Sequence, residues 1–120
     1  MPGNALADCS DVLVEQRTKP PPFFSVCIPQ YSSYPFLLVQ LETLAGQTYK
    51  SFEVCISDDL SNEQHQASAA IEFLRANKLA FAYRIQGRNL RYDANLRAAI
   101  DLAQGEYVVL MGNDDRFVDE

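Results

Sequence analysis

Four short apolar runs recur along the chain, and amphipathic stretches separate them. The runs are rich in β-branched and aromatic residues and end at polar or turn-forming residues, which is typical of buried strands. They lie at about Phe23–Ile28, Phe52–Ser57, Ala80–Ile85 and Glu106–Met111. Pro29 is expected to end the first strand, because proline offers no N–H to a ladder.

Apolar residues at helical spacing predict a helix after each of the first three strands. The helices are expected from near Tyr34 to an end at Gly46, from Ser61 onward, and from about Tyr92 to Ala103. Alternating strands and helices predict an α/β fold with a doubly wound, mostly parallel sheet and helices on both faces, as in a Rossmann-like half-domain. Residues 1–22 are expected to be a flexible leader, in which residues 12–14 could form a short element, and residues 23–120 the domain.

Composition narrows the function classes. With 120 residues, 48% of them hydrophobic, the chain can bury one core. A net charge of −6 argues against nonspecific binding to nucleic acid or to an anionic membrane, and would repel a phosphate-bearing ligand unless a cation were bound. Three cysteines without a CxxC pair indicate a reduced compartment. No apolar run has transmembrane length, so we expect a cytoplasmic protein, at most peripheral to the inner face of the membrane.

Residues whose side chains could bind a ligand follow three of the four predicted strands. Tyr31 follows the first, Asp58 and Asp59 the second, and Asn113-Asp114-Asp115 the fourth. In open α/β sheets ligands bind beyond the carboxyl ends of the strands. Paired carboxylates there suit a divalent cation such as Mg²⁺ or Mn²⁺. Each residue also has a structural interpretation: a surface tyrosine, a turn-forming aspartate pair, and an aspartate that caps a helix.

Familiar nucleotide signatures are missing, since the chain has neither GxGxxG after the first strand nor a P-loop. Four segments nevertheless resemble family 2 glycosyltransferases in order and spacing. They are Ser25-Val-Cys-Ile-Pro-Gln-Tyr-Ser32, Gln47-Thr-Tyr-Lys-Ser-Phe-Glu-Val54, Ser57-Asp-Asp-Leu-Ser61 and Ala103-Gln-Gly-Glu-Tyr107. The resemblance covers about residues 23–118 and implies a GT-A fold, an inverting reaction and a nucleotide-diphospho-sugar donor. Residues 89–95 and the Gly-Asn-Asp-Asp ending look most like bacterial members that build surface polysaccharides.

The resemblance also implies roles for individual residues. Tyr31 matches the aromatic residue that packs on the base, Asp59 the aspartate that binds base or ribose, and Arg91 a basic residue near the nucleotide. The implied nucleotide-binding set is Pro29, Tyr31, Asp59, Arg91 and Asn113, and the implied metal ligands are Asp114 and Asp115.

Two positions depart from the family pattern. Gly112 replaces the first aspartate of the Asp-x-Asp motif, and Ser32 the asparagine after the loop tyrosine. The first change leaves metal binding to Asp114, helped by Asp115. A base-binding role for Asp59 predicts that Asp59→Ala weakens nucleotide binding about tenfold while the melting temperature of the free protein hardly changes.

In this family the catalytic base and the acceptor site lie beyond the Asp-x-Asp motif. We therefore expect this chain to bind the donor without transferring sugar to a saccharide or lipid-linked acceptor, and to self-associate through an open sheet edge. An alternative is a non-catalytic nucleotide-binding or assembly domain on the same scaffold. A phosphoacceptor domain of the response-regulator type would need a lysine after a later strand, which the sequence lacks.

Overall fold

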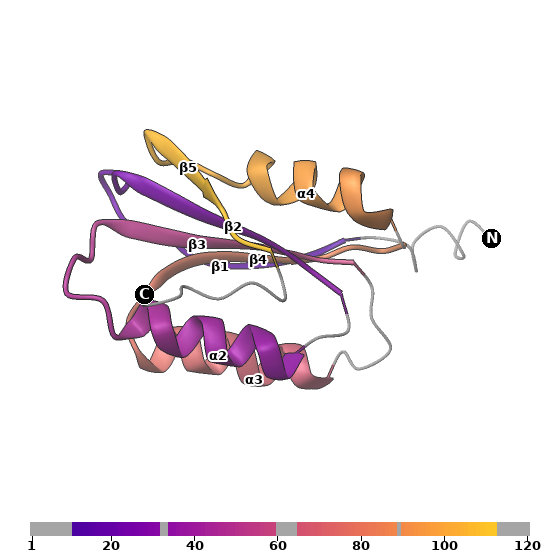
Figure 1. Ribbon diagram of the computed structural model, residues 1–120, viewed down its shortest axis with the longest axis horizontal. Helices are drawn as coiled ribbons and strands as arrows, with labels where there is room; N and C mark the ends of the chain where they lie inside the picture. The colour runs from indigo at the N-terminus through magenta and orange to yellow at the C-terminus, as the bar shows by residue number, and fades with distance from the viewer. Residues whose placement is uncertain (1–10, 32–33, 60–64, 89, 113–120) are drawn as a thin grey trace.

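The computed structural model describes residues 11–31, 34–59, 65–88 and 90–112. Within these residues strands and helices alternate as the sequence predicts, and one further strand precedes them (Figure 1). The elements are β1 Val12–Gln16, β2 Phe24–Gln30, α2 Tyr34–Ala45, β3 Phe52–Asp58, α3 His65–Ala76, β4 Ala80–Ile85, α4 Arg91–Asp101 and β5 Tyr107–Leu110.

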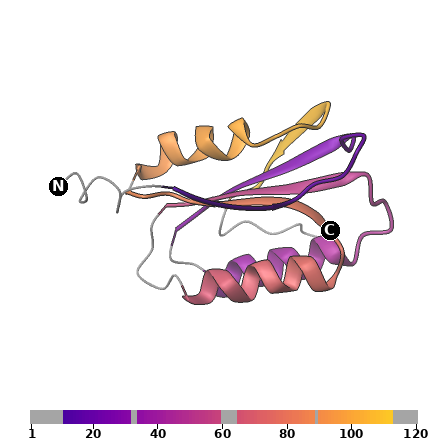
Figure 2. The same ribbon diagram turned by 180° about the vertical axis from the view of Figure 1, so that it is seen from behind.

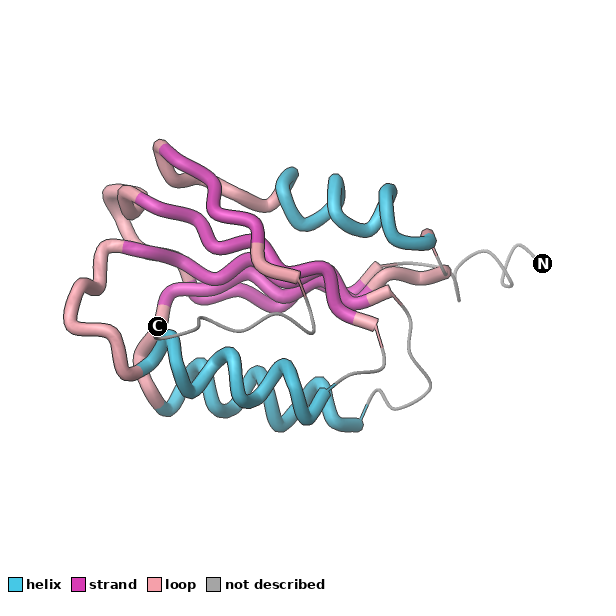
Figure 3. Tube along the Cα trace, viewed as in Figure 1, coloured by secondary structure: helices cyan, strands magenta, loops and turns pink. Residues whose placement is uncertain are grey.

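The strands form one sheet in the order β1-β4-β3-β2-β5. Strands β4, β3, β2 and β5 are parallel, and β1 pairs with β4 in the antiparallel sense. Helices α2 and α3 cover one face and α4 the other, as the two opposite views in Figure 1 and Figure 2 show. Figure 3 shows the same three layers by element type. The predicted doubly wound α/β architecture is confirmed.

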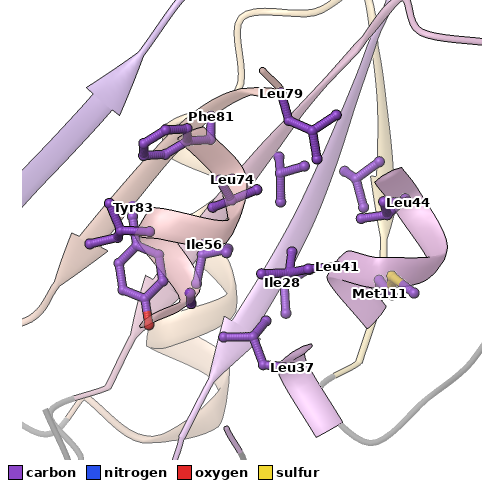
Figure 4. Packing of buried hydrophobic residues seen from close by; sticks show 14 of the residues in the cluster. Ile28, Leu37, Leu41, Leu44, Ile56, Leu74, Leu79, Phe81, Tyr83 and Met111 are labelled. Atoms are coloured by element: carbon purple, nitrogen blue, oxygen red, sulfur yellow. The ribbon is translucent and has the colours of Figure 1, made fainter. Parts of the chain in front are cut away.

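Strand alternation divides the core between the two faces of the sheet. Ile28 of β2 and Ile56 of β3 pack with Leu41 of α2 in the larger cluster, beneath α2 and α3 (Figure 4). The opposite face carries smaller residues under α4, namely Cys27, Cys55, Ala82, Ala99 and Leu102. Cys27 and Cys55 are opposite each other in the β2–β3 register and are buried free thiols.

The structure bears on two sequence-based expectations about strands. The short element that residues 12–14 could form is present within the expected leader as β1 Val12–Gln16, whose backbone completes the open edge of β4. Pro29 does not end the first strand but lies inside β2, opposite Ser57. The carbonyl of the next residue, Gln30, accepts a hydrogen bond from the β3 side. Backbone groups of successive residues in a strand point to opposite neighbours, so the backbone nitrogen of Pro29 points toward β5. The missing N–H is tolerated because the pairing with β5 has already ended at Leu110.

The element ends otherwise differ by one or two residues from the expected ones. Helix α4 begins at Arg91 and ends at Asp101, short of the expected Ala103. Ser61, where the second helix was expected to begin, lies outside the described residues. No helix in the described part of the chain combines the length and apolar character needed to cross a membrane.

A buried carboxylate ties the amino ends of the strands together. Glu53 of β3 accepts hydrogen bonds from the Ser25 hydroxyl (2.6 Å) and the backbone N–H of Gln104 (2.7 Å). It also pairs with Arg17 at 2.8 Å, just after β1. Gly105 approaches β2 closely, and a Cβ there would lie 2.7 Å from the Ser25 hydroxyl oxygen. This contact explains why the Ala103–Tyr107 segment needs a glycine at its centre.

Candidate functional site

The carboxyl ends of β2, β3 and β4 are level with one another. Gln30, Asp58 and Ile85 occupy one row of the register. The ladder continues one residue further, because Asp59 N–H donates to the Gln30 carbonyl (2.7 Å) and Gln86 N–H to the Asp58 carbonyl (2.8 Å). The loops after these strands therefore start from one rigid edge.

Asp59 holds the start of α4 at this edge. Its Oδ1 accepts the N–H of Leu90 (2.5 Å) and its Oδ2 the N–H of Arg91 (2.9 Å). These are backbone groups of a helix N-terminus, where a negative charge is favourable. Only 4% of Asp59 is exposed. A carboxylate has about four acceptor positions, so these two bonds leave capacity for a ligand donor.

Asp58 lies on the opposite face of the sheet, as strand alternation requires. Its Oδ2 accepts the hydroxyl of Tyr34 of α2 (2.5 Å) and the hydroxyl of Tyr83 of β4 (2.9 Å). Burial and the neighbouring Asp58 carboxylate raise the pKa of Tyr83 far above its ordinary value, so its hydroxyl stays a donor. Asp58 is fully buried. Of the aspartate pair, only Asp59 belongs to the edge where a ligand would bind.

Tyr31 and Arg91 flank Asp59 and present exposed side chains. Tyr31 is 51% exposed and follows Gln30, whose carbonyl is bonded to Asp59 N–H. The backbone of Arg91 has φ 70°, a conformation that residues with a Cβ rarely adopt, and its N–H donates to Asp59. Three predicted nucleotide-binding residues therefore lie at one edge: Arg91 is bonded directly to Asp59, and Tyr31 follows Gln30, which is bonded to Asp59. Pro29 is buried in β2.

The remaining predicted residues, Asn113, Asp114 and Asp115, lie outside the described residues. Gly112 just before them is held by α2, because the Gln40 side-chain amide donates to its carbonyl (2.5 Å). In the described part of the chain no group of three or more His, Cys, Asp and Glu side chains could hold a metal ion.

A buried polar network supports the edge from the α4 side. Gln86 Nε2 donates to the Ser57 hydroxyl (2.6 Å), which donates to Asn95 Oδ1 (2.7 Å). Asn95 Nδ2 in turn donates to the Gln30 carbonyl (3.3 Å). Sequence analysis missed this network and the tyrosines on Asp58. The available signal was a polar residue, Asn95, facing the apolar side of a predicted helix.

These residues define the chemistry available at the edge. An exposed aromatic ring can stack on a planar heterocycle, a buried carboxylate can accept from its N–H groups, and a guanidinium can approach an attached anionic group. At the start of α4, Asp59 already occupies the N–H groups of Leu90 and Arg91.

Comparison with known proteins agrees with this arrangement. The family described as glycosyl transferase family 2 matches residues 25–120. The amylovoran biosynthesis glycosyltransferase AmsB of Erwinia amylovora is 31% identical over 94 residues, which are 78% of this chain and 31% of AmsB.

Two solved structures are similar in fold. S. aureus TarS 1–349 in complex with UDP superimposes with a TM-score of 0.69 at 30% identity, over 78% of this chain and 28% of TarS. The mannosyltransferase PcManGT of Pyrobaculum calidifontis, in complex with GDP-Man and Mn²⁺, has a TM-score of 0.71 at 22% identity, over 86% of this chain and 31% of that one.

The expected GT-A fold and the family resemblance are both confirmed. The chain covers about three-tenths of the length of AmsB, of TarS 1–349 and of PcManGT. The motif segments singled out in the sequence fall inside the matched residues 25–120, and they form the strand ends and the Gly105 turn described above. The chain therefore belongs to glycosyl transferase family 2.

Proposed function

We propose that the carboxyl edge of β2, β3 and β4 binds the nucleoside diphosphate of a nucleotide-sugar donor. The chain would be the donor-binding part of an inverting glycosyltransferase of bacterial surface-polysaccharide synthesis. The observation that supports this most directly is that Tyr31, Asp59 and Arg91 follow three separate strands and lie at the same edge of the sheet. The relatives AmsB, in amylovoran biosynthesis, and TarS, in complex with UDP, support the polysaccharide and nucleotide parts of the proposal.

Each side chain has a distinct role in this proposal. The exposed ring of Tyr31 packs on the base, and Asp59 accepts a hydrogen bond from base or ribose with its remaining acceptor capacity. The guanidinium of Arg91 approaches the nucleotide from the start of α4. Asn113 is assigned to the ribose side. Pro29 shapes the floor of the site from within β2.

We further propose that Asp114, helped by Asp115, holds a divalent cation such as Mn²⁺ or Mg²⁺. The chain carries a net charge of −6, which would otherwise oppose a diphosphate. Gln40 holds the carbonyl of Gly112, so the residues that follow start from a fixed point at the end of β5. When bound, such a cation would neutralise the diphosphate as it leaves.

The reaction of the larger enzyme would be displacement at the anomeric carbon by an acceptor hydroxyl of a saccharide or lipid-linked sugar. A general base must lie within hydrogen-bond reach of that hydroxyl. We assign this base to residues after the Asp-x-Asp-like motif, and the place of action to the cytoplasm, at the inner face of the membrane. No described side chain is assigned to the base.

Titration calorimetry with UDP, GDP, CDP and dTDP, with and without Mn²⁺, tests the proposal on the full chain. We expect one nucleotide to bind best, with Mn²⁺ strengthening it. Tyr31→Ala should weaken binding about tenfold, since a stacked base contributes about 1–3 kcal/mol. Tyr49→Ala is the matched control, because Tyr49 is 53% exposed but lies in the loop before β3, at the opposite edge. Equal affinities for the two variants would contradict the assignment of Tyr31, and absence of any nucleotide binding would contradict the function.

A further inference from the structure

The connection between β2 and α2 is anchored at both ends, by Asp59 at its start and by Asp58, the last residue of β3, at its end. At its start, the Gln30 carbonyl accepts Asp59 N–H (2.7 Å) and the Asn95 amide (3.3 Å). At its end, the Tyr34 hydroxyl donates to the Asp58 carboxylate (2.5 Å). Tyr31 lies between these anchors and is half exposed. Both anchors therefore lie within three positions of Tyr31 in the sequence.

The second anchor is entirely internal. Tyr34 and Asp58 are both fully buried, so the hydroxyl that joins them contacts no solvent. A hydrogen bond in such a setting is shielded from competition by water. The first residue of α2 is thus joined to the last residue of β3.

We propose that Tyr34 is a positioning residue for the donor nucleotide: through its bond to Asp58 it holds the start of α2, and with it the loop that presents Tyr31 to the base. The inference rests on the proposed function of the site. Tyr34 itself does not touch the ligand, because it is buried under the sheet edge. Its effect on binding is exerted through Tyr31.

Tyr83 provides an internal control for this idea. Its hydroxyl donates to the same oxygen of Asp58 (2.9 Å), and its ring is equally buried. Tyr83, however, belongs to β4, in register with Ile56 of β3, and is not attached to the loop that carries Tyr31. Each substitution removes one bond to the same carboxylate oxygen together with the contact between the two hydroxyls, so the two losses are comparable.

The experiment compares Tyr34→Phe with Tyr83→Phe in the full chain, using UDP in the presence of Mn²⁺ or whichever nucleotide binds best. Both variants should lower the melting temperature by similar amounts. Only Tyr34→Phe should weaken nucleotide binding, by about three- to tenfold, the loss expected for one hydrogen bond that acts through geometry. In a Tyr31→Ala background, Tyr34→Phe should have no further effect on affinity, because the residue it positions is gone.

Hydrogen exchange of the free protein gives a readout without ligand. Exchange in the peptide covering residues 28–37 should increase in Tyr34→Phe and stay unchanged in Tyr83→Phe. Equal changes of affinity or of exchange in the two variants would overturn the inference, as would additive effects of Tyr31→Ala and Tyr34→Phe. If the wild-type chain binds no nucleotide, the proposed function fails, and the exchange comparison still decides whether Tyr34 holds the loop.

Discussion

At the scale of single residues, Asp59 combines a structural and a proposed binding role. The sequence suggests only the second, which is why Asp59→Ala was expected to leave the stability of the free protein nearly unchanged. The structure changes that expectation, since both carboxylate oxygens accept partly buried backbone N–H groups of Leu90 and Arg91. The partners of Asp59 could not be predicted from sequence, because they depend on the distance between β3 and a loop 31 residues away.

Asp59→Ala should therefore destabilise the free protein. Two N–H groups lose their acceptor in a partly buried setting, and we expect a loss of about 2 kcal/mol in the free energy of unfolding. Asp59→Asn keeps one acceptor oxygen and should lose less. Urea denaturation measures both, with Asp93→Ala as the control, because Asp93 is exposed in the first turn of the same helix. A stability of Asp59→Ala equal to that of Asp93→Ala would show that the two bonds contribute nothing.

At Arg91, the effect of the backbone conformation on stability can be measured separately from the effect of the side chain on binding. Its φ of 70° costs a residue with a Cβ about 1–2 kcal/mol, whereas glycine adopts it freely. Arg91→Gly should therefore be about 1 kcal/mol more stable than Arg91→Ala in thermal unfolding. Both variants lack the guanidinium and should bind nucleotide equally weakly. The prediction fails if the alanine variant is the more stable one.

At the scale of elements, the pattern of apolar residues was sufficient to predict the strands that are buried on both faces and the helices that cover them. β3 and β4 were predicted within a residue of their observed bounds, because continuous apolar runs mark such strands clearly. β1 is different. Val12–Gln16 alternates weakly and gains its structure from β4, a partner more than sixty residues away. A strand that forms because of pairing with a distant strand has only a weak pattern in its own sequence.

The turn between α4 and β5 offers a test at this scale. A Cβ on Gly105 would lie 2.7 Å from the Ser25 hydroxyl oxygen and 2.9 Å from the Phe24 carbonyl carbon. Gly105→Ala should destabilise the protein by about 1–3 kcal/mol, the usual cost of overpacking. Gly46→Ala is the matched control, because its Cβ would meet only backbone oxygens at 3.6 Å, an ordinary contact. Equal stability of the two variants in urea would contradict the close approach.

At the scale of the whole molecule, the two helical layers differ in what they cover. α2 and α3 cover the large apolar cluster, and α4 covers small residues that include two neighbouring thiols. The hydrogen bond between Cys27 and Cys55, together with burial, raises the pKa of Cys55 well above that of a free thiol. The pKa of Tyr83 is raised as well, by burial and by Asp58. Both groups stay protonated in the folded protein under conditions in which they ionise in the unfolded chain.

Stability should consequently fall as the pH rises above about 8.5, where free thiols begin to ionise. The unfolded chain then binds fewer protons than the folded protein, so the free energy of unfolding decreases with a limiting slope of about 1.4 kcal/mol per pH unit for each group. Below that pH both contributions are fully present. Cys55→Ala should move the onset toward about pH 10, where tyrosine ionises. Denaturation in urea and reductant at pH 7 to 10.5 measures this, and identical pH profiles for wild type and Cys55→Ala would contradict it.

The pairing of β1 with β4 also has a consequence for how the molecule is made. Gln16 hydrogen-bonds Leu79, 63 positions later. At about 5–20 residues per second, a ribosome exposes β1 roughly 3 to 13 seconds before it supplies that partner. During this interval the apolar run Val12-Leu13-Val14 has no sheet to join. The segment synthesised first among the described strands must therefore wait for its place, and in a growing chain it is the one most exposed to chaperones and to wrong partners.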